Sequence, residues 1–325
     1  MDLHISVIAD FKNLFPNIEI VDWCLSGHAW VFNKSRFIPN HIHPENWINI
    51  NEGMILAFQQ EYDEFLKTFD GFICGHPNGF ALVFEKYNKP IIIINSCRYD
   101  LPFCISRDYH MLDLHKKCLL RLQEKGLLIA VSNNKVDQLY TKLGCGIDTV
   151  HIPSLCSYTG IKYNPNRDTF LCYNGPFPFP KHPLISYKHE LGHPFQWSDI
   201  SQFKGIIHFP YEVSTMSMFE HYSGGMPLFF PSKIYILEKG NITTISSYWN
   251  QNLPDDLNHF SNISNYIDLA DFYQVFKSPN VYLYDSFEHL VELLETFEWK
   301  EDSNILEEYK QNIKDEWVKR IDFML

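Results

Sequence analysis

Short apolar runs alternate with amphipathic stretches from one end of the chain to the other. Runs rich in Val and Ile predict buried strands, and apolar residues that recur every three or four positions predict helices. Strands that alternate with helices are typical of an α/β fold with parallel sheets. In the first half of the chain, the strand-like runs are residues 4–8, 18–24, 71–74, 90–95, 127–131 and 149–152.

The helices expected between these strands are amphipathic and bounded by capping residues. They cover residues 54–69, 108–125 and 134–143, the last of which ends at Gly144 as a C-cap. Several of the strands are continuous β-branched runs, which is the pattern of a parallel sheet covered on both faces. The elements together predict a doubly wound, Rossmann-like domain over residues 1–156, which is a typical size for one domain.

A polar, turn-rich stretch without periodicity follows, and residues 157–168 are therefore predicted to be a linker. A second doubly wound domain is expected over residues 169–302, and residues 303–325 form a C-terminal helix that can pack back on the first domain. Two such domains place a ligand crevice between the facing carboxyl ends of their strands. The elements expected in the second half are strands 169–173, 205–209, 227–230 and 281–284 and helices 198–203, 215–222, 269–276 and 285–298, where Asp285 and Glu288 form a capping box.

Composition narrows the class of protein. The chain has 325 residues, of which 45% are hydrophobic and 20% charged, and this excludes collagen, coiled coil and general disorder. With 39 acidic and 27 basic residues the net charge is −12, which argues against broad nucleic-acid binding. The eight cysteines form no Cys-x-x-Cys pair, and no signal peptide or membrane-spanning run is evident. We expect a soluble, cytoplasmic protein in a reducing compartment.

The most informative segment is residues 205–232, which parses as strand, loop, helix, Gly-Gly turn and strand. Ser214 is a suitable N-cap for the helix. The backbone amides of the next three residues would then point out of the helix start and form an anion site that fits a diphosphate. These residues are Thr215, Met216 and Ser217.

Two glutamates flank the start of this helix. Glu212 precedes it, and Glu220 follows eight residues later, before the turn Gly225-Met-Pro227. The segment resembles the Glu-x7-Glu signature of GT-B glycosyltransferases, in which two Rossmann-like domains face each other across a cleft. The resemblance implies that Glu212 lies by the donor sugar and that Glu220 binds the ribose. A glutamate at a helix start also compensates the helix dipole, and one within a helix is often solvated, which are the structural alternatives.

Three residues in the first half of the chain are candidate catalytic residues. The segment 70–76 looks like the strand that ends in a cleft histidine in these enzymes, which implies a donor-sugar contact or a base role for His76. His28, after the second expected strand, is placed to reach an acceptor. Asp10, at the end of the first expected strand, is another candidate base. Each of the three also has a structural interpretation as a loop residue that satisfies backbone groups.

Basic and glycine residues complete the expected donor site. GT-B family members place basic residues against the donor diphosphate near the exit of the first strand of the second domain, which implies a contact through Lys181, close to Gly175. Arg98, after the strand at 90–95, is another candidate for a phosphate or acceptor contact. Solvated surface charge is the alternative for both cations.

The leading hypothesis is a glycosyltransferase that moves a sugar from a UDP- or GDP-linked donor to a glycan or small-molecule acceptor. No P-loop, Gly-x-Gly-x-x-Gly or Asp-x-Asp motif is present, so neither a metal nor another cofactor is expected. The Glu-x7-Glu resemblance implies retention of the anomeric configuration, and inversion with His76 as base is the alternative. A nucleotide-sugar epimerase of the same fold and a non-catalytic sugar-binding protein are the other classes left open.

Overall fold

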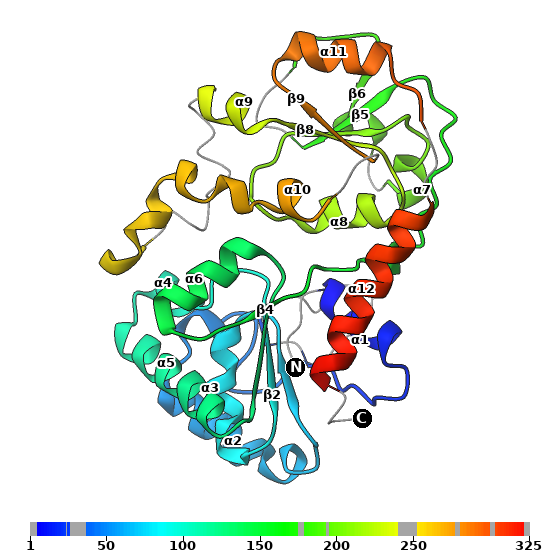
Figure 1. Ribbon diagram of the computed structural model, residues 1–325. Helices are drawn as coiled ribbons and strands as arrows, with labels where there is room; N and C mark the ends of the chain where they lie inside the picture. Colours follow the sequence, from blue (N-terminus) through cyan, green and yellow to red (C-terminus); the bar gives the residue numbers. More distant parts are fainter. Residues whose placement is uncertain are drawn as a thin grey trace. The chain divides into compact units, whose positions relative to one another are not determined.

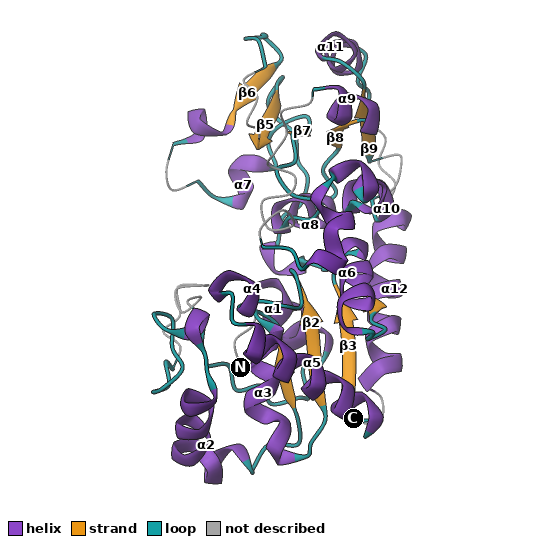
Figure 2. Cartoon of the chain, turned by 90° about the vertical axis from the view of Figure 1, so that its left-hand side faces the viewer, coloured by secondary structure: helices purple, strands orange, loops and turns teal. Residues whose placement is uncertain are grey.

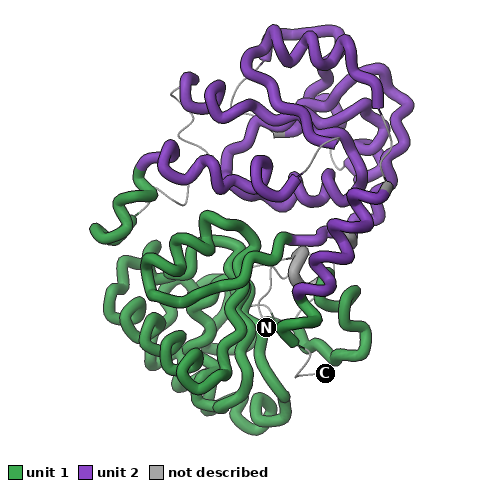
Figure 3. The backbone as a smooth tube through the Cα atoms, viewed as in Figure 1, with its two compact units in different colours: residues 1–153, 248–261, 317–325 green, residues 154–247, 262–316 purple. Residues whose placement is uncertain are grey.

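The computed structural model describes residues 5–23, 25–26, 37–174, 179–192, 195–239, 252–276, 280–299 and 303–321. The chain divides into two compact units (Figure 3). Each unit is built on a sheet of parallel strands, with four strands in unit 1 and five in unit 2, which confirms the predicted α/β class. Unit 1 comprises residues 1–153, 248–261 and 317–325, and unit 2 comprises residues 154–247 and 262–316.

The sheet of unit 1 contains β1 (Phe72–Cys74), β2 (Ile91–Asn95), β3 (Leu128–Ser132) and β4 (Val150–His151). All four were predicted as strands. They lie side by side in chain order, so the order of the described strands does not reverse anywhere. The doubly wound arrangement predicted for this domain is therefore not found among them. Every residue of β2 is buried, as a continuous Ile run in the middle of a sheet requires.

The predicted helices of unit 1 are also present. They are α2 (Glu52–Leu66), α5 (Tyr109–Glu124) and α6 (Lys135–Cys145), joined by the short α3 (Ala81–Phe84) and α4 (Phe103–Ser106). Each of the three long helices begins at an Asn or Asp whose side chain accepts a backbone N–H of the first turn. Helices α3 and α5 lie on one face of the sheet (Figures 1 and 2).

The first predicted strand is wrong, because residues Ile5–Leu14 form helix α1. Ile8, Phe11 and Phe15 follow one another at spacings of three and four, which is the helical period, and short apolar runs cannot distinguish the two. Residues 18–22, predicted within a second strand, have no regular structure, and Trp23 forms only an isolated bridge with Phe37.

The sheet of unit 2 contains β5 (Phe170–Asn174), β6 (Ile185–Tyr187), β7 (Ile206–His208), β8 (Leu228–Pro231) and β9 (Val281–Tyr284). Four of them were predicted, and β6 was not. Their order is β6-β5-β7-β8-β9. The chain passes from β5 to β6 on one side of β5, and then to β7 on its other side. This reversal between β5 and β7 is a topological switch point, and open α/β sheets bind ligands at the carboxyl ends of the strands there.

The helices of unit 2 alternate with the strands, and one predicted cap is corrected here. Ser286, and not Asp285, is the N-cap of the helix after β9, since its side chain accepts the N–H of His289. The final helix begins in unit 2 and ends in unit 1. The helices are α7 (Trp197–Ile200), α8 (Met216–Ser223), α9 (Lys233–Glu238), α10 (Asp271–Gln274), α11 (Phe287–Glu295) and α12 (Ser303–Ile321) (Figure 1).

Candidate functional site

Polar side chains gather at the switch point of unit 2. Tyr173 lies near the end of β5, Lys188 begins the 3-10 turn that follows β6, and His208 ends β7. Glu220 and His221 come from α8, the helix that follows β7. Three adjacent strands and the second half of helix α8 therefore supply this cluster, because the carboxyl ends of parallel strands meet at one edge of the sheet.

Glu220 is the carboxylate of this cluster, and its side chain is only 7% exposed. Tyr158, from the turn Ser157–Thr159 before β5, donates its hydroxyl to Glu220 Oε1 at 2.5 Å. Burial raises the pKa of Glu220, while the Tyr158 hydroxyl and the charge of Lys188 act in the opposite direction. A buried carboxylate with a hydroxyl donor and a nearby cation can accept hydrogen bonds from ligand hydroxyl groups.

Lys188 is the cation whose charge lowers the pKa of Glu220. Its Nζ lies 3.8 Å from the centroid of the Tyr173 ring and 5.3 Å from that of Phe195. Burial lowers the pKa of Lys188, and the charge of Glu220 opposes that change. The resemblance to GT-B enzymes implies Lys181 instead, which is exposed in the structure. Lys188 was missed because it follows β6, a strand of three residues that the apolar pattern does not reveal.

Two buried imidazole rings, those of His208 and His221, belong to this cluster. His208 Nε2 and His221 Nδ1 are 3.1 Å apart, and both side chains are fully buried. Burial and the charge of Lys188 lower the pKa of His208 to about 3, and burial, His208 and Lys188 lower the pKa of His221 well below its usual value. Both rings are thus neutral near pH 7, so one ring donates its N–H to the other.

The start of α8 lies one residue later than the sequence predicts. Thr215, and not Ser214, is the N-cap, with an extended backbone at φ −138° and ψ 146°. The Thr215 and Ser217 hydroxyls are 3.2 Å apart, and Met216 is the first residue of the helix. The three predicted anion-site residues, Thr215, Met216 and Ser217, therefore lie at the helix start, and Ser214 lies just before it. Glu212, a few residues earlier, is 8% exposed.

In unit 1, His76 follows β1 and lies at the carboxyl edge of the sheet, as predicted. Its ring centroid is 5.9 Å from that of Trp47, and its backbone carbonyl accepts a hydrogen bond from Ser26 Oγ at 2.9 Å. The hydroxyl of Ser96, which follows β2, donates to the Gly75 carbonyl at 3.1 Å. The edge is thus polar and internally hydrogen-bonded.

Two of the remaining candidates, Asp10 and Arg98, lie within the described residues. Asp10 is buried within helix α1, so its placement at the end of a strand is wrong. Arg98 is 1% exposed, and its guanidinium binds Asp100 with Nε–Oδ1 and Nη2–Oδ2 distances of 3.0 and 2.6 Å, which neutralises its charge within unit 1. His28 and Gly175 lie outside the described residues.

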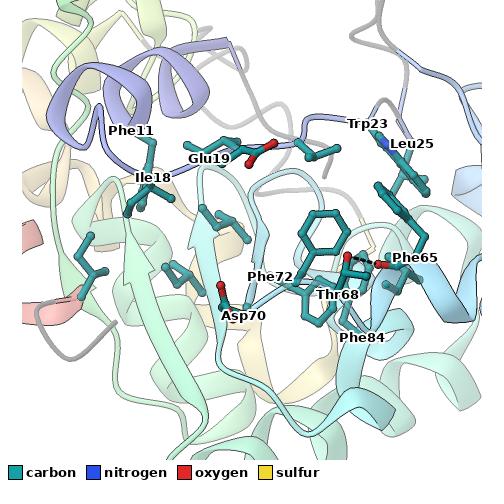
Figure 4. A pocket seen from close by; sticks show the side chains of 18 residues that line it. Phe11, Ile18, Glu19, Trp23, Leu25, Phe65, Thr68, Asp70, Phe72 and Phe84 are labelled. Carbon is teal, nitrogen blue, oxygen red and sulfur yellow. Dashed lines mark hydrogen bonds between the residues drawn. The ribbon is translucent and has the colours of Figure 1, made fainter. Parts of the chain in front are cut away.

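Unit 1 also contains a cavity of about 370 Å³ (Figure 4). Apolar side chains, aliphatic and aromatic, make up most of its lining, among them Phe11 of α1, Trp23 and Phe72, and the carboxylates are Glu19 and Asp70. It lies near the start of β1, whereas His76 follows the end of that strand. The cavity is therefore separate from the polar carboxyl edge.

No group of three or more His, Cys, Asp or Glu side chains is arranged to hold a metal ion in the described ranges. Within the same ranges, none of the helices combines the length and the apolar character needed to cross a bilayer. Comparison of this chain with protein-family models, curated proteins and solved structures finds no match.

Proposed function

We propose that unit 2 binds the nucleoside diphosphate of a nucleotide sugar and that the protein is a glycosyltransferase of the GT-B type. The observation that carries the proposal is Glu220, a buried carboxylate on the helix that follows the switch-point strand β7. Its spacing from Glu212 is that of the Glu-x7-Glu signature, and both glutamates are buried. Solvated surface glutamates would be exposed, so burial favours a functional role for both.

The groups around Glu220 suit the parts of a nucleotide sugar. In this proposal the carboxylate accepts hydrogen bonds from the ribose hydroxyls, and the start of α8 binds the diphosphate through its backbone amides. Lys188 supplies positive charge that acts on the same site. These groups stabilise the nucleoside diphosphate as it leaves, which lowers the barrier for breaking the glycosidic bond.

The proposed reaction transfers the sugar to an acceptor hydroxyl. The bond between the anomeric carbon and the donor phosphate oxygen breaks, and a bond from the anomeric carbon to the acceptor oxygen forms. The acceptor proton passes to the leaving phosphate or to a protein base. With Glu212 by the donor sugar, we propose that the product retains the anomeric configuration, as the Glu-x7-Glu spacing implies.

The first prediction tests nucleotide binding by thermal shift with UDP-, GDP- and dTDP-sugars. A ligand present at about one hundred times its dissociation constant adds about 2.7 kcal/mol of stability, so one base should raise the melting temperature clearly. Glu220→Gln should weaken binding of that nucleotide by about 1 to 3 kcal/mol, because ribose hydroxyls would lose a charged acceptor in a buried site. Glu295→Gln, at an exposed glutamate of α11, serves as the matched control.

Unchanged nucleotide affinity in Glu220→Gln would remove the basis of the proposal. If a nucleotide sugar binds, proton NMR of the first product formed with an acceptor reports whether the anomeric configuration is retained. Conversion of the donor sugar to its epimer without any acceptor would instead establish the epimerase class.

A further inference from the structure

The segment that brings the chain into unit 2 contacts helix α8 and the part of helix α12 that belongs to unit 2. The Ser154 carbonyl accepts a hydrogen bond from the Tyr309 hydroxyl of α12 at 2.8 Å. The Ser223 hydroxyl, at the end of α8, lies 3.3 Å from the Cys156 carbonyl and 2.8 Å from its nearer acceptor, the Phe219 carbonyl. These contacts hold the backbone on both sides of residue 155, and they end two residues before Tyr158.

Tyr158 continues this segment and reaches back to the carboxylate of the candidate site. Its hydroxyl donates to Glu220 Oε1 at 2.5 Å. Glu220 Oε2 makes no hydrogen bond with any residue in the described ranges. The other titratable groups that act on or respond to Glu220 are Lys188 and Tyr173.

We propose that Tyr158 is a positioning residue for Glu220, which fixes one carboxylate oxygen and leaves the other for the hydroxyl groups of a ribonucleoside diphosphate. This inference rests on the proposed function. A glutamate side chain has several rotatable bonds, and ordering it when a ligand binds costs affinity. A hydroxyl held by an anchored backbone segment orders the carboxylate before the ligand arrives. The same hydrogen bond favours the ionised form of a carboxylate that burial would otherwise tend to protonate.

The test compares Tyr158→Phe with Tyr163→Phe. The Tyr163 hydroxyl lies in the same stretch of chain and donates to the Lys204 carbonyl at 2.7 Å, so its loss removes a comparable hydrogen bond that does not involve Glu220. Carbon-13 NMR of glutamate-labelled, ligand-free protein gives the titration midpoint of Glu220, with Glu220→Gln identifying the signal. We expect the midpoint to move to higher pH in Tyr158→Phe and to stay in place in Tyr163→Phe.

The second readout is calorimetric titration with UDP and with GDP between pH 5 and pH 8. Tyr158→Phe should weaken the preferred nucleotide about 3- to 10-fold at pH 7, the effect of one lost hydrogen bond. The pH midpoint of binding should also move upward, which a loss of general stability would not cause.

The outcomes separate the two proposals. If Glu220→Gln weakens binding while Tyr158→Phe leaves both the affinity and the NMR midpoint at wild-type values, the positioning role is overturned alone. If Glu220→Gln retains wild-type affinity for UDP and GDP, the proposed function fails and this inference fails with it. Equal NMR shifts in the two tyrosine variants would also overturn the positioning role, because the effect would then not come through Glu220.

Discussion

At the scale of single residues, the two units use buried charge differently. In unit 1, Arg98 and Asp100 form a bidentate ion pair that is almost completely removed from solvent. Tyr140 donates its hydroxyl to Asp100 Oδ2 at 2.8 Å, so that carboxylate accepts three hydrogen bonds. In unit 2, the buried Glu220 has an oxygen without such a partner within the described part of the chain. Only the second arrangement leaves capacity for a ligand.

The ion pair leads to the second prediction, for Asp100→Asn. Removing one partner of a buried pair leaves the other charge uncompensated, and this costs about 3 to 5 kcal/mol of unfolding free energy. Urea denaturation with an unchanged slope measures the loss. The control is Asp113→Asn, which removes an exposed ion pair with Lys117 and should change stability by less than about 1 kcal/mol. Similar losses in both variants would contradict the structural role assigned to Asp100.

At the scale of elements, the sequence predicts what is long or continuously apolar. Strand β2 and helix α5 are both found close to their predicted limits, because their patterns extend over whole elements. Strand β6 has three residues with the middle one polar, too few to establish a period. The apolar run of helix α1 is short, and its pattern therefore predicts a strand instead of a helix. Tertiary contacts decide such short segments, and a sequence pattern does not contain them.

The residues of the candidate site also separate into those that the sequence pattern predicts and those that it does not. Glu220 was found because it lies at a fixed spacing on a predicted helix after a predicted strand. Lys188 depends on the unpredicted β6, and Tyr158 belongs to a segment without periodicity that was predicted to be a linker. His208 and His221 come together only because β7 and α8 pack against each other. The motif residues could thus be predicted, and their neighbours could not.

Helix α6 provides the third prediction. Gly144 was predicted as its C-cap, but Gly146 has that role, with φ 75°, and Gly144 lies inside the helix. A Cβ at Gly144 would lie 2.5 Å from the Tyr99 hydroxyl and 2.6 Å from Tyr99 Cε1. Gly144→Ala should therefore destabilise unit 1 by about 1 to 3 kcal/mol through overpacking, although alanine favours a helix interior by about 1 kcal/mol.

Thermal denaturation measures this effect, and a double variant provides the control. Tyr99→Phe removes the atom nearest the new Cβ, so Gly144→Ala should cost less in the Tyr99→Phe background than in the wild type. A stabilised Gly144→Ala protein would show that helix propensity outweighs the close approach.

At the scale of the whole molecule, both units bury histidines that are neutral in the folded state. Burial lowers the pKa of His115 and of His151 in unit 1 to about 4, and that of His208 in unit 2 to about 3. The pKa of His221, also in unit 2, is lowered as well. In an unfolded chain these side chains would titrate near pH 6.5. The folded protein therefore binds fewer protons than the unfolded chain below that pH.

The last prediction concerns acid stability and follows from this difference in proton binding. Above about pH 6.5 these histidines are neutral in both states and cause no pH dependence. As the pH falls below about 6.5, the unfolded chain takes up protons first, so stability decreases by as much as about 1.4 kcal/mol per pH unit for each histidine, until the folded pKa is reached.

The formal net charge of −12 acts in the opposite direction, since losing negative charge relieves repulsion in the folded protein. That repulsion is spread over a surface screened by salt, whereas the histidines are buried, and so we expect the histidine effect to dominate between pH 6.5 and pH 4. His115→Leu should reduce the slope of unfolding free energy against pH in this window by as much as about 1.4 kcal/mol per pH unit, because the pKa of His115 is lowered to about 4 in the folded protein. Urea denaturation at half-unit pH steps measures the slope, and an identical slope in His115→Leu and the wild type would show that His115 is protonated in the folded protein.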